Sequence, residues 1–140
     1  MTWIIDTSVA IKWAVEEEGS DRAAQFIGGE VVAPDLLRSE LGNALWKKVL
    51  RQEIGALQAA AAFAAIEGSL AFVSTERLAG RALEIALSIR HPVYDCVYLA
   101  LAEATDMQIL TADRKLIVSC RPTPFAPYLI ALDEVSLPGR

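Results

Sequence analysis

Four acidic side chains stand where predicted strands end or on predicted helices, namely Asp6, Glu40, Asp95 and Asp113. Asp6 follows the apolar run WII, and Asp113 comes two residues after Thr111, which closes the apolar run ILT. Asp95 heads an almost wholly apolar segment. Carboxylates gathered in one cleft must share protons or bind a cation, so the chemistry depends on whether the fold brings these four together.

Each acid also has an ordinary structural explanation when it is considered alone. Asp95 and Asp113 would lie in the first turns of helices, where free backbone N–H groups and the helix dipole favour a carboxylate. Asp6 could simply end a strand. Glu40, at the border of an apolar helix face, could extend to solvent. No single acid establishes a functional site, and the prediction depends on convergence.

Convergence of the four acids would create strong repulsion. At about 5 Å spacing, each pair of carboxylates repels by roughly 3 kcal/mol at an effective dielectric constant of about 20. No lysine or arginine adjoins all four acids in the sequence to offset this repulsion. Oxygen ligands without histidine or cysteine favour hard ions such as Mg²⁺ or Mn²⁺. Because these ions activate water and neutralise phosphodiester charge, the pattern indicates phosphoryl chemistry.

The elements that would position these acids alternate between short apolar runs and helical patterns. Strands are predicted at residues 3–5, 31–33, 70–74, 107–111 and 127–132. A long helix at 35–53 and an alanine-rich helix at 56–68 follow the second strand. This alternation predicts an α/β fold, a three-layer α/β/α sandwich with a mainly parallel sheet of about five strands. Sites in such sheets lie beyond the carboxyl ends of strands, so Asp6 and Asp113 should share one edge.

Polar residues before the helical patterns predict where the helices begin. Thr7 and Ser8 offer an N-cap for a short first helix, Asp35 one for the long helix, and Thr75 one for a helix that reaches about residue 90. Pro92 ends that helix, and the adjoining His91 is expected in a surface turn.

Composition and charge limit the class of protein. The chain has 140 residues, 54% hydrophobic and 22% charged, which predicts one globular domain over residues 1–140. The net charge of −5 argues against coating nucleic acid by general electrostatics, and setting aside the four acids leaves −1. No apolar run is long enough to span a membrane and the N-terminus lacks a signal-peptide pattern, so a cytoplasmic protein is expected. Cys96 and Cys120 are expected as buried hydrophobic residues.

Four segments together resemble the PIN-domain ribonucleases, most closely the VapC toxins of bacterial toxin–antitoxin pairs. They are IIDTSVAIKW (4–13), PDLLRSELGNAL (34–45), HPVYDCVYLALAEA (91–104) and ILTADRKL (109–116). Their order and spacing match the family. The resemblance implies a PIN-like sandwich with a helical hairpin inserted after the second strand. It also implies a metal-dependent endoribonuclease, a hydrolase that acts as the toxin of a toxin–antitoxin pair.

The resemblance also implies roles for individual residues. It assigns the metal-binding catalytic quartet to Asp6, Glu40, Asp95 and Asp113, with Mg²⁺ or Mn²⁺ as cofactor. In the expected mechanism, the bound metal activates water for in-line attack on an RNA phosphodiester, and Glu40 acts through water or orients the nucleophile. Supporting positions match at Ser8, Asn43 and Thr111. The family further implies an RNA substrate, a homodimer and a small antitoxin that blocks the cleft.

Basic side chains near the acids could contact RNA phosphates, and the candidates are Lys12, Lys47, Arg114 and Lys115. Exposed lysine and arginine side chains are most often solvated, so this role stays open from the sequence.

Two other function classes fit part of the pattern. A receiver-like signalling domain also has a parallel sheet and an acidic Mg²⁺ pocket, but it normally needs adjacent acids after the first strand and a lysine after a late strand. Here Asp6 stands alone before Thr7, and TAD follows the late strand. A non-catalytic interaction module is the third class, and retained partner binding without RNA cleavage would favour it.

Overall fold

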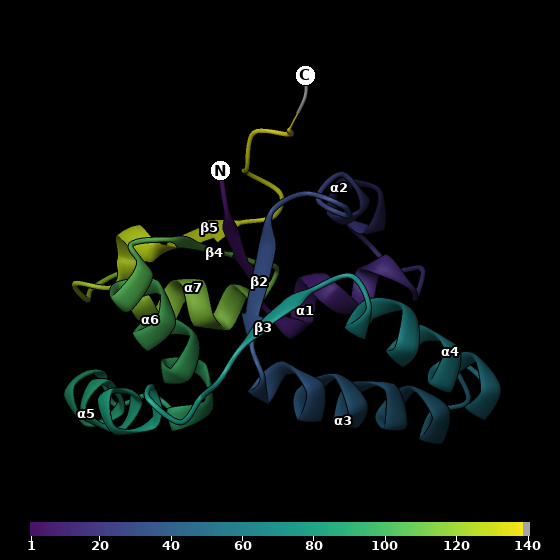
Figure 1. Ribbon diagram of the computed structural model, residues 1–140, viewed down its shortest axis with the longest axis horizontal. Coiled ribbons are helices and arrows are strands. Elements are labelled where there is room, and N and C mark those ends of the chain that lie inside the picture. Colours follow the sequence, from purple (N-terminus) through teal and green to yellow (C-terminus); the bar gives the residue numbers. More distant parts are fainter. Residues whose placement is uncertain (139–140) are drawn as a thin grey trace.

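The computed structural model describes residues 1–138, and its core is a five-stranded parallel sheet (Figure 1). The strands are β1 (Trp3–Ile5), β2 (Val31–Pro34), β3 (Ala71–Val73), β4 (Gln108–Thr111) and β5 (Leu129–Ala131). Their order across the sheet is β3-β2-β1-β4-β5, and every neighbouring pair is parallel. The predicted parallel α/β fold is therefore confirmed. The carboxyl ends of β1 and β4 lie side by side where the strand order reverses.

Helices cover both faces of this sheet. One face carries α5 (Ala79–Ile89), α6 (Val93–Thr105) and α7 (Arg114–Cys120). The other carries α1 (Thr7–Ala10), the 3-10 helix η1 (Ile11–Trp13), α2 (Ser20–Ala24), α3 (Leu36–Leu50) and α4 (Ala56–Glu67). A second 3-10 helix, η2 (Ala126–Tyr128), leads into β5. These three layers confirm the predicted sandwich.

Alternation along the strands explains how one sheet supports two cores. Ile4 and Ile109 pack into the core under α5 and α6, whereas Ile5 and Leu110 pack into the core under α1 and α3. Helix α6 is buried continuously from Cys96 to Ala102. That enclosure explains its apolar run, because a helix covered on most sides has no need of a polar face.

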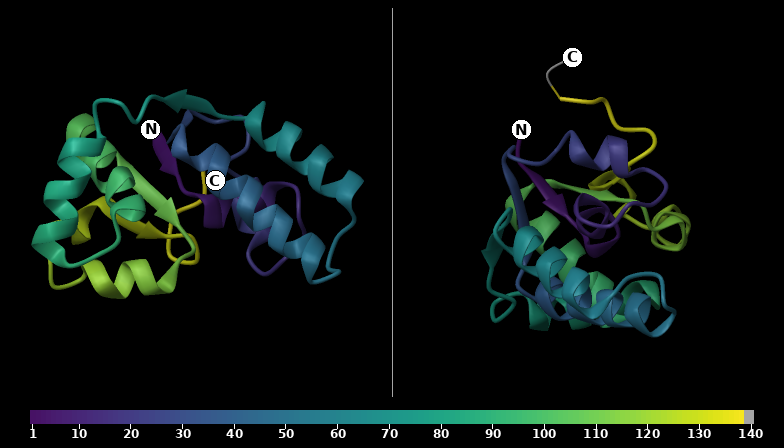
Figure 2. Two further views of the ribbon diagram at one scale, coloured as in Figure 1. Left: turned by 90° about the horizontal axis from the view of Figure 1, so that it is seen from below. Right: turned by 90° about the vertical axis from the view of Figure 1, so that its right-hand side faces the viewer.

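The α3–α4 hairpin follows β2, as the sequence predicted. Leu37, Leu41 and Leu45 form the buried stripe of α3, and Ala62 and Ile66 are the buried residues of α4. In the views of Figure 1 and Figure 2, the hairpin lies at one end of the molecule and α5 lies at the other.

Three of the predicted helix starts differ from the structure. Asp6 rather than Thr7 or Ser8 caps α1, since its side chain accepts from the Val9 N–H. Asp35 precedes α3 but its Oδ1 accepts from the Thr75 N–H at 3.1 Å, so it joins the ends of β2 and β3 instead of capping the helix. Helix α5 begins only at Ala79, after a turn.

Both cysteines are buried and free, as expected. Burial raises the pKa of the Cys96 thiol to about 11, so it stays protonated at neutral pH and behaves as a small hydrophobic group. Among the described helices, none has both the length and the apolar character needed to cross a membrane.

Candidate active site

Asp6 is the most enclosed acid at the carboxyl edge of the sheet. Its Oδ1 accepts from Ser8 Oγ at 2.6 Å and from the Val9 N–H at 3.2 Å, and its Oδ2 accepts from Thr111 Oγ1. The Thr111 hydroxyl brings the end of β4 to the end of β1. Ser8 and Thr111 therefore contact the carboxylate that the family resemblance expected them to support.

The electrostatic environment of Asp6 is unfavourable for a negative charge. Burial raises its pKa from 3.8 to about 6, hydrogen bonds from Ser8, Thr111 and Val9 oppose that rise, and the nearby Asp113 carboxylate adds to it. Within residues 1–138, no lysine or arginine forms an ion pair with any of the four acids. A charge of this kind is typical of a site that neutralises it with a bound ion or proton.

Asp113 is held at the same edge by the turn that follows β4. Its backbone N–H donates to Thr111 Oγ1 at 3.0 Å, and its Oδ1 caps α7 by accepting from the Leu116 N–H at 3.2 Å. The Ala112 N–H donates to Ser8 Oγ at 2.9 Å. These hydrogen bonds join the segments that follow β1 and β4. Asp6 and Asp113 therefore lie at the same edge of the sheet, as their positions at strand ends predicted.

Glu40 reaches the site from the second turn of α3. Its Oε1 accepts from Tyr98 Oη at 2.7 Å and from Thr7 Oγ1 at 3.2 Å. Burial raises the pKa of Glu40, the two hydroxyl donors oppose the rise, and the charge of Asp95 adds to it. The glutamate therefore points to the site and not to bulk solvent, which sets aside the solvent-facing explanation.

Asp95 lies in the first turn of α6, but it is not the cap of that helix. Its Oδ2 lies 2.6 Å from His91 Nε2, four residues earlier. A carboxylate can only accept, so Nε2 carries the proton in this contact. His91 does lie in the turn between α5 and α6, as expected, but its side chain is only 14% exposed, so the ring is largely buried against Asp95 and not at the surface.

The acids are arranged as two facing pairs joined by hydroxyl groups. Asp113 lies close enough to Asp6 for its charge to raise the pKa of Asp6, and Asp95 lies close enough to Glu40 to raise the pKa of Glu40. Thr7 joins the pairs, because it follows Asp6 in the chain and donates to Glu40. Across residues 1–138, however, no three His, Cys, Asp or Glu side chains are grouped closely enough to hold a metal ion. Glu40, Asp95 and Asp113 each turn one oxygen to a protein donor, whereas both oxygens of Asp6 accept hydrogen bonds.

The donor chemistry of this edge nevertheless fits a hard divalent cation. In the described hydrogen bonds, Glu40 uses only Oε1, Asp95 only Oδ2 and Asp113 only Oδ1, so each keeps a second oxygen for another partner. The ligands are oxygens alone, which Mg²⁺ and Mn²⁺ prefer. Hydrogen-bonded donors behind the ligands are the usual means of orienting carboxylates toward a metal.

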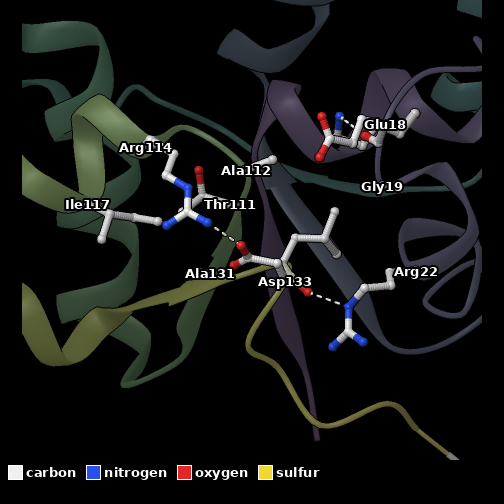
Figure 3. Close-up of a pocket in the computed structure, with 11 residues that line it drawn as sticks. Glu18, Gly19, Arg22, Thr111, Ala112, Arg114, Ile117, Ala131 and Asp133 are labelled. Atoms are coloured by element: carbon white, nitrogen blue, oxygen red, sulfur yellow. Dashed lines mark hydrogen bonds and ion pairs between the residues drawn. The ribbon is translucent and has the colours of Figure 1, made fainter.

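The remaining predicted residues lie around the edge without touching the acids. Asn43 is exposed one turn beyond Glu40, and Lys47 and Lys115 are exposed as well. Lys12 is largely buried in a pair with Glu17 at 3.0 Å. Arg114 pairs with Asp133 and not with Asp113, the acid that precedes it (Figure 3).

Three residues of the site were not predicted from the sequence: Thr7, His91 and Tyr98. His91 and Tyr98 stand four residues before and three residues after Asp95. The three-residue spacing places Asp95 and Tyr98 on one face of α6, so Tyr98 carried a signal, whereas His91 precedes the helix. These residues were not predicted as part of the site because the apolar run around Tyr98 and the Pro92 after His91 have ordinary structural explanations.

Two sequence relatives and two solved structures are similar to this chain. Ribonuclease VapC1 of Mycobacterium tuberculosis is 41% identical over 88 residues, covering 60% of this chain and 63% of that relative, so the match spans less than two thirds of the relative's length. Ribonuclease VapC3 of Pyrobaculum aerophilum is 32% identical over 124 residues, covering 83% and 92%.

The solved structures share the fold at low sequence identity. PAE2754 from Pyrobaculum aerophilum superposes with a TM-score of 0.74 at 21% identity, covering 95% of this chain and 85% of that one. A toxin–antitoxin complex from Klebsiella pneumoniae gives a TM-score of 0.70 at 13% identity, covering 96% and 100%.

The family model named PIN domain matches residues 3–119, which contain all four acids. The sheet order, the paired acids at its carboxyl edge and this match agree, and the chain belongs to the PIN-domain family.

Proposed function

We propose that this protein is a metal-dependent endoribonuclease and the toxin of a toxin–antitoxin pair. The observation that carries the proposal is the proximity of Asp6 to Asp113 and of Glu40 to Asp95 at one sheet edge, where no lysine or arginine of residues 1–138 forms an ion pair with them. The similarity to proteins named Ribonuclease VapC supports RNA as the substrate.

Glu40, Asp95 and Asp113 would hold Mg²⁺ or Mn²⁺ through their available oxygens, and Asp6 through the second lone pair of its Oδ2. When bound, such an ion supplies activation of water and neutralisation of phosphodiester charge. Ser8 and Thr111 fix Asp6, His91 fixes Asp95, and the α7 backbone fixes Asp113. Because these side chains are held before substrate arrives, little reorganisation is needed during the reaction.

Glu40 would orient the attacking water. Its raised pKa brings the carboxyl closer to the range in which it can accept a proton from that water, while Tyr98 and Thr7 hold its other oxygen. In-line attack on phosphorus would expel the 3′-oxygen and leave a 5′-phosphate and a 3′-hydroxyl on the fragments.

Purified protein is expected to cut structured RNA with Mg²⁺ or Mn²⁺ and to lose that activity in EDTA. Mapping of the new 5′ ends checks the chemistry, since fragments with a 5′-phosphate ligate directly and those with a 5′-hydroxyl do not. Equal cleavage with Mg²⁺ and with EDTA would refute the metal mechanism. An acyl-phosphate formed from a small phosphodonor would favour the receiver-like alternative instead.

His91 is expected to set the position of the Asp95 carboxylate. Its backbone N–H donates to Ala86 O at the end of α5, and its carbonyl accepts from Cys96 Sγ at 3.8 Å, so the residue is fixed on both sides. His91→Ala should lower kcat about tenfold with little change in KM, because a lost supporting contact of this kind costs about 10- to 100-fold. His91→Gln, which keeps an N–H donor, should recover part of the loss. Equal loss in both variants would contradict an orienting role.

The proposed antitoxin needs an apolar surface, and the hairpin offers one. Trp46, Leu50 and Leu57 are 56%, 62% and 89% exposed on α3 and α4. We propose that an apolar helix of the antitoxin packs there, consistent with the toxin–antitoxin complex among the similar structures.

A second group of exposed apolar side chains lies on α5 and α6, and we propose it as the homodimer contact. Its members are Leu83, Leu87, Val93 and Tyr94.

The hairpin surface can be tested without damage to the core. Leu50→Asp and Leu57→Asp together should weaken binding of a candidate antitoxin at least about tenfold, measured by calorimetry. Val118→Asp is the control, since Val118 is 53% exposed on α7 and lies outside both patches. Unchanged affinity in the double variant would rule out the hairpin as the docking surface.

A further inference from the structure

A cavity of about 250 Å³ opens beside the acids, between η1, α2, the start of α7 and the end of β5 (Figure 3). Residues that line it include Lys12, Arg22, Thr111, Arg114, Ile117 and Leu132. Thr111 belongs to both sites, because its hydroxyl donates to Asp6. The volume lies just below the roughly 300–1,000 Å³ of clefts for drug-sized ligands, so the cavity suits a small molecular unit.

The three basic side chains of this cavity differ in how firmly they are held. Arg22 donates to Leu132 O at 2.8 Å and also to the Val135 carbonyl. Lys12 donates to the Glu18 carbonyl at 2.6 Å and pairs with Glu17. These contacts hold the Arg22 and Lys12 side chains in the lining of the cavity.

Arg114 is the basic side chain that can change partner. It pairs with Asp133, and the two side chains are 67% and 54% exposed. Exposed pairs of this kind contribute little free energy, so an incoming anion can displace the Asp133 carboxylate. Arg114 follows Asp113 in the chain and lines the cavity together with Thr111, whose hydroxyl donates to Asp6.

The floor of the cavity is apolar. Ile117 and Leu132 present aliphatic side chains to it, and Gly19 lies beside Leu132 in the lining. A Cβ at Gly19 would lie 3.4 Å from Leu132 Cδ2 and 3.5 Å from Lys12 Cε, and its φ of +87° already favours glycine. The lining therefore has an aliphatic part at Ile117 and Leu132 and a basic part at Arg114.

We infer that this cavity binds one nucleotide of the RNA strand next to the phosphodiester held at the acids. The base packs on Ile117 and Leu132. The phosphate of the nucleotide accepts hydrogen bonds from Arg114 in place of the Asp133 carboxylate. An aliphatic face with an arginine at its edge suits a nucleobase joined to a phosphate. This inference rests on the proposed ribonuclease function and identifies the part of the site that selects the substrate.

The binding step can be measured apart from cleavage. In EDTA, each of the four nucleoside 5′-monophosphates is titrated into the ¹⁵N-labelled chain and followed by amide NMR shifts. At least one should move the Ala112, Ile117 and Leu132 signals, while inorganic phosphate should bind at least about tenfold more weakly because it lacks the base. Phosphate that binds as tightly as every nucleotide would overturn the inference.

Two variants separate nucleotide binding from a merely structural ion pair. Arg114→Gln should weaken nucleotide binding about tenfold, since it removes a charge-assisted hydrogen bond. Asp133→Asn should tighten it about threefold, because it removes a competing carboxylate. Arg121→Gln removes an equal charge from the other end of α7 and should leave the affinity unchanged. Changes of the same sign at Arg114 and Asp133, or no shifts in the native chain, would overturn the inference.

Cleavage assays then separate this inference from the proposed function. If RNA is cut, Arg114→Gln should raise KM about tenfold and leave kcat near the native value. A fall in kcat with KM unchanged would contradict a binding role. If no RNA is cut while nucleotides still bind in EDTA, the ribonuclease proposal fails and the nucleotide cavity stands.

Discussion

Asp95→Asn is expected to lower the rate of RNA cleavage by at least about 100-fold. The substitution preserves the shape of the side chain, and its amide oxygen can still accept from His91 Nε2. It removes the negative charge that faces Glu40 and one of the proposed oxygen ligands. Because ligands contribute more to metal binding than the residues behind them, the loss should exceed the effect expected for His91→Ala.

Asp106→Asn is the matched control for that experiment. Asp106 stands at the opposite end of α6, exposed and in the left-handed conformation that asparagine also adopts. Its cleavage rate and its melting temperature should equal those of the native chain. A native rate in Asp95→Asn, with Mg²⁺ binding retained, would remove Asp95 from the catalytic set.

The stability of the metal-free protein is expected to fall as the pH rises toward 6. The folded-state pKa of Asp6 is raised from 3.8 to about 6, so between these values the folded state binds more protons than the unfolded state. Stability then decreases with rising pH through this window and levels off above it. The size of the effect is about 3 kcal/mol, since one pKa unit corresponds to about 1.4 kcal/mol.

Asp6→Asn isolates this contribution from those of the other acids. In EDTA above pH 7, the variant should be more stable than the native chain by up to about 3 kcal/mol, and the difference should vanish near pH 4. Added Mg²⁺ should stabilise the native chain and not the variant. Denaturant melts at several pH values measure all of this. A stability difference that stays constant with pH would contradict the raised pKa.

The strand pattern alone predicted much of this arrangement. Asp6 and Asp113 could be placed together because parallel strands end at a common edge, a rule that needs only the positions of WII and ILT. The two faces of the sheet followed from the alternation of strands and helices. Ser8 and Thr111 came from the family resemblance, and the structure brings both to Asp6.

Contacts between distant helices were beyond the reach of sequence patterns. Tyr98 donates to Glu40 across 58 positions in the chain, and no local periodicity encodes that meeting. Asp35 satisfied every local rule for a helix cap, yet tertiary pairing gives it the Thr75 amide instead. The position of the Arg114–Asp133 pair depends on where β5 ends. The sequence predicted that strand only as residues 127–132.

The hydrogen bond from Thr111 to Asp6 joins positions 105 apart in the chain, across the pairing of β4 with β1. A growing polypeptide on the ribosome therefore cannot complete its acid set until β4 has emerged and inserted beside β1. Synthesis runs from the N-terminus, so the α3–α4 hairpin emerges well before the last acid. A partner that docks on the hairpin could thus engage the nascent chain while it is still chemically inert.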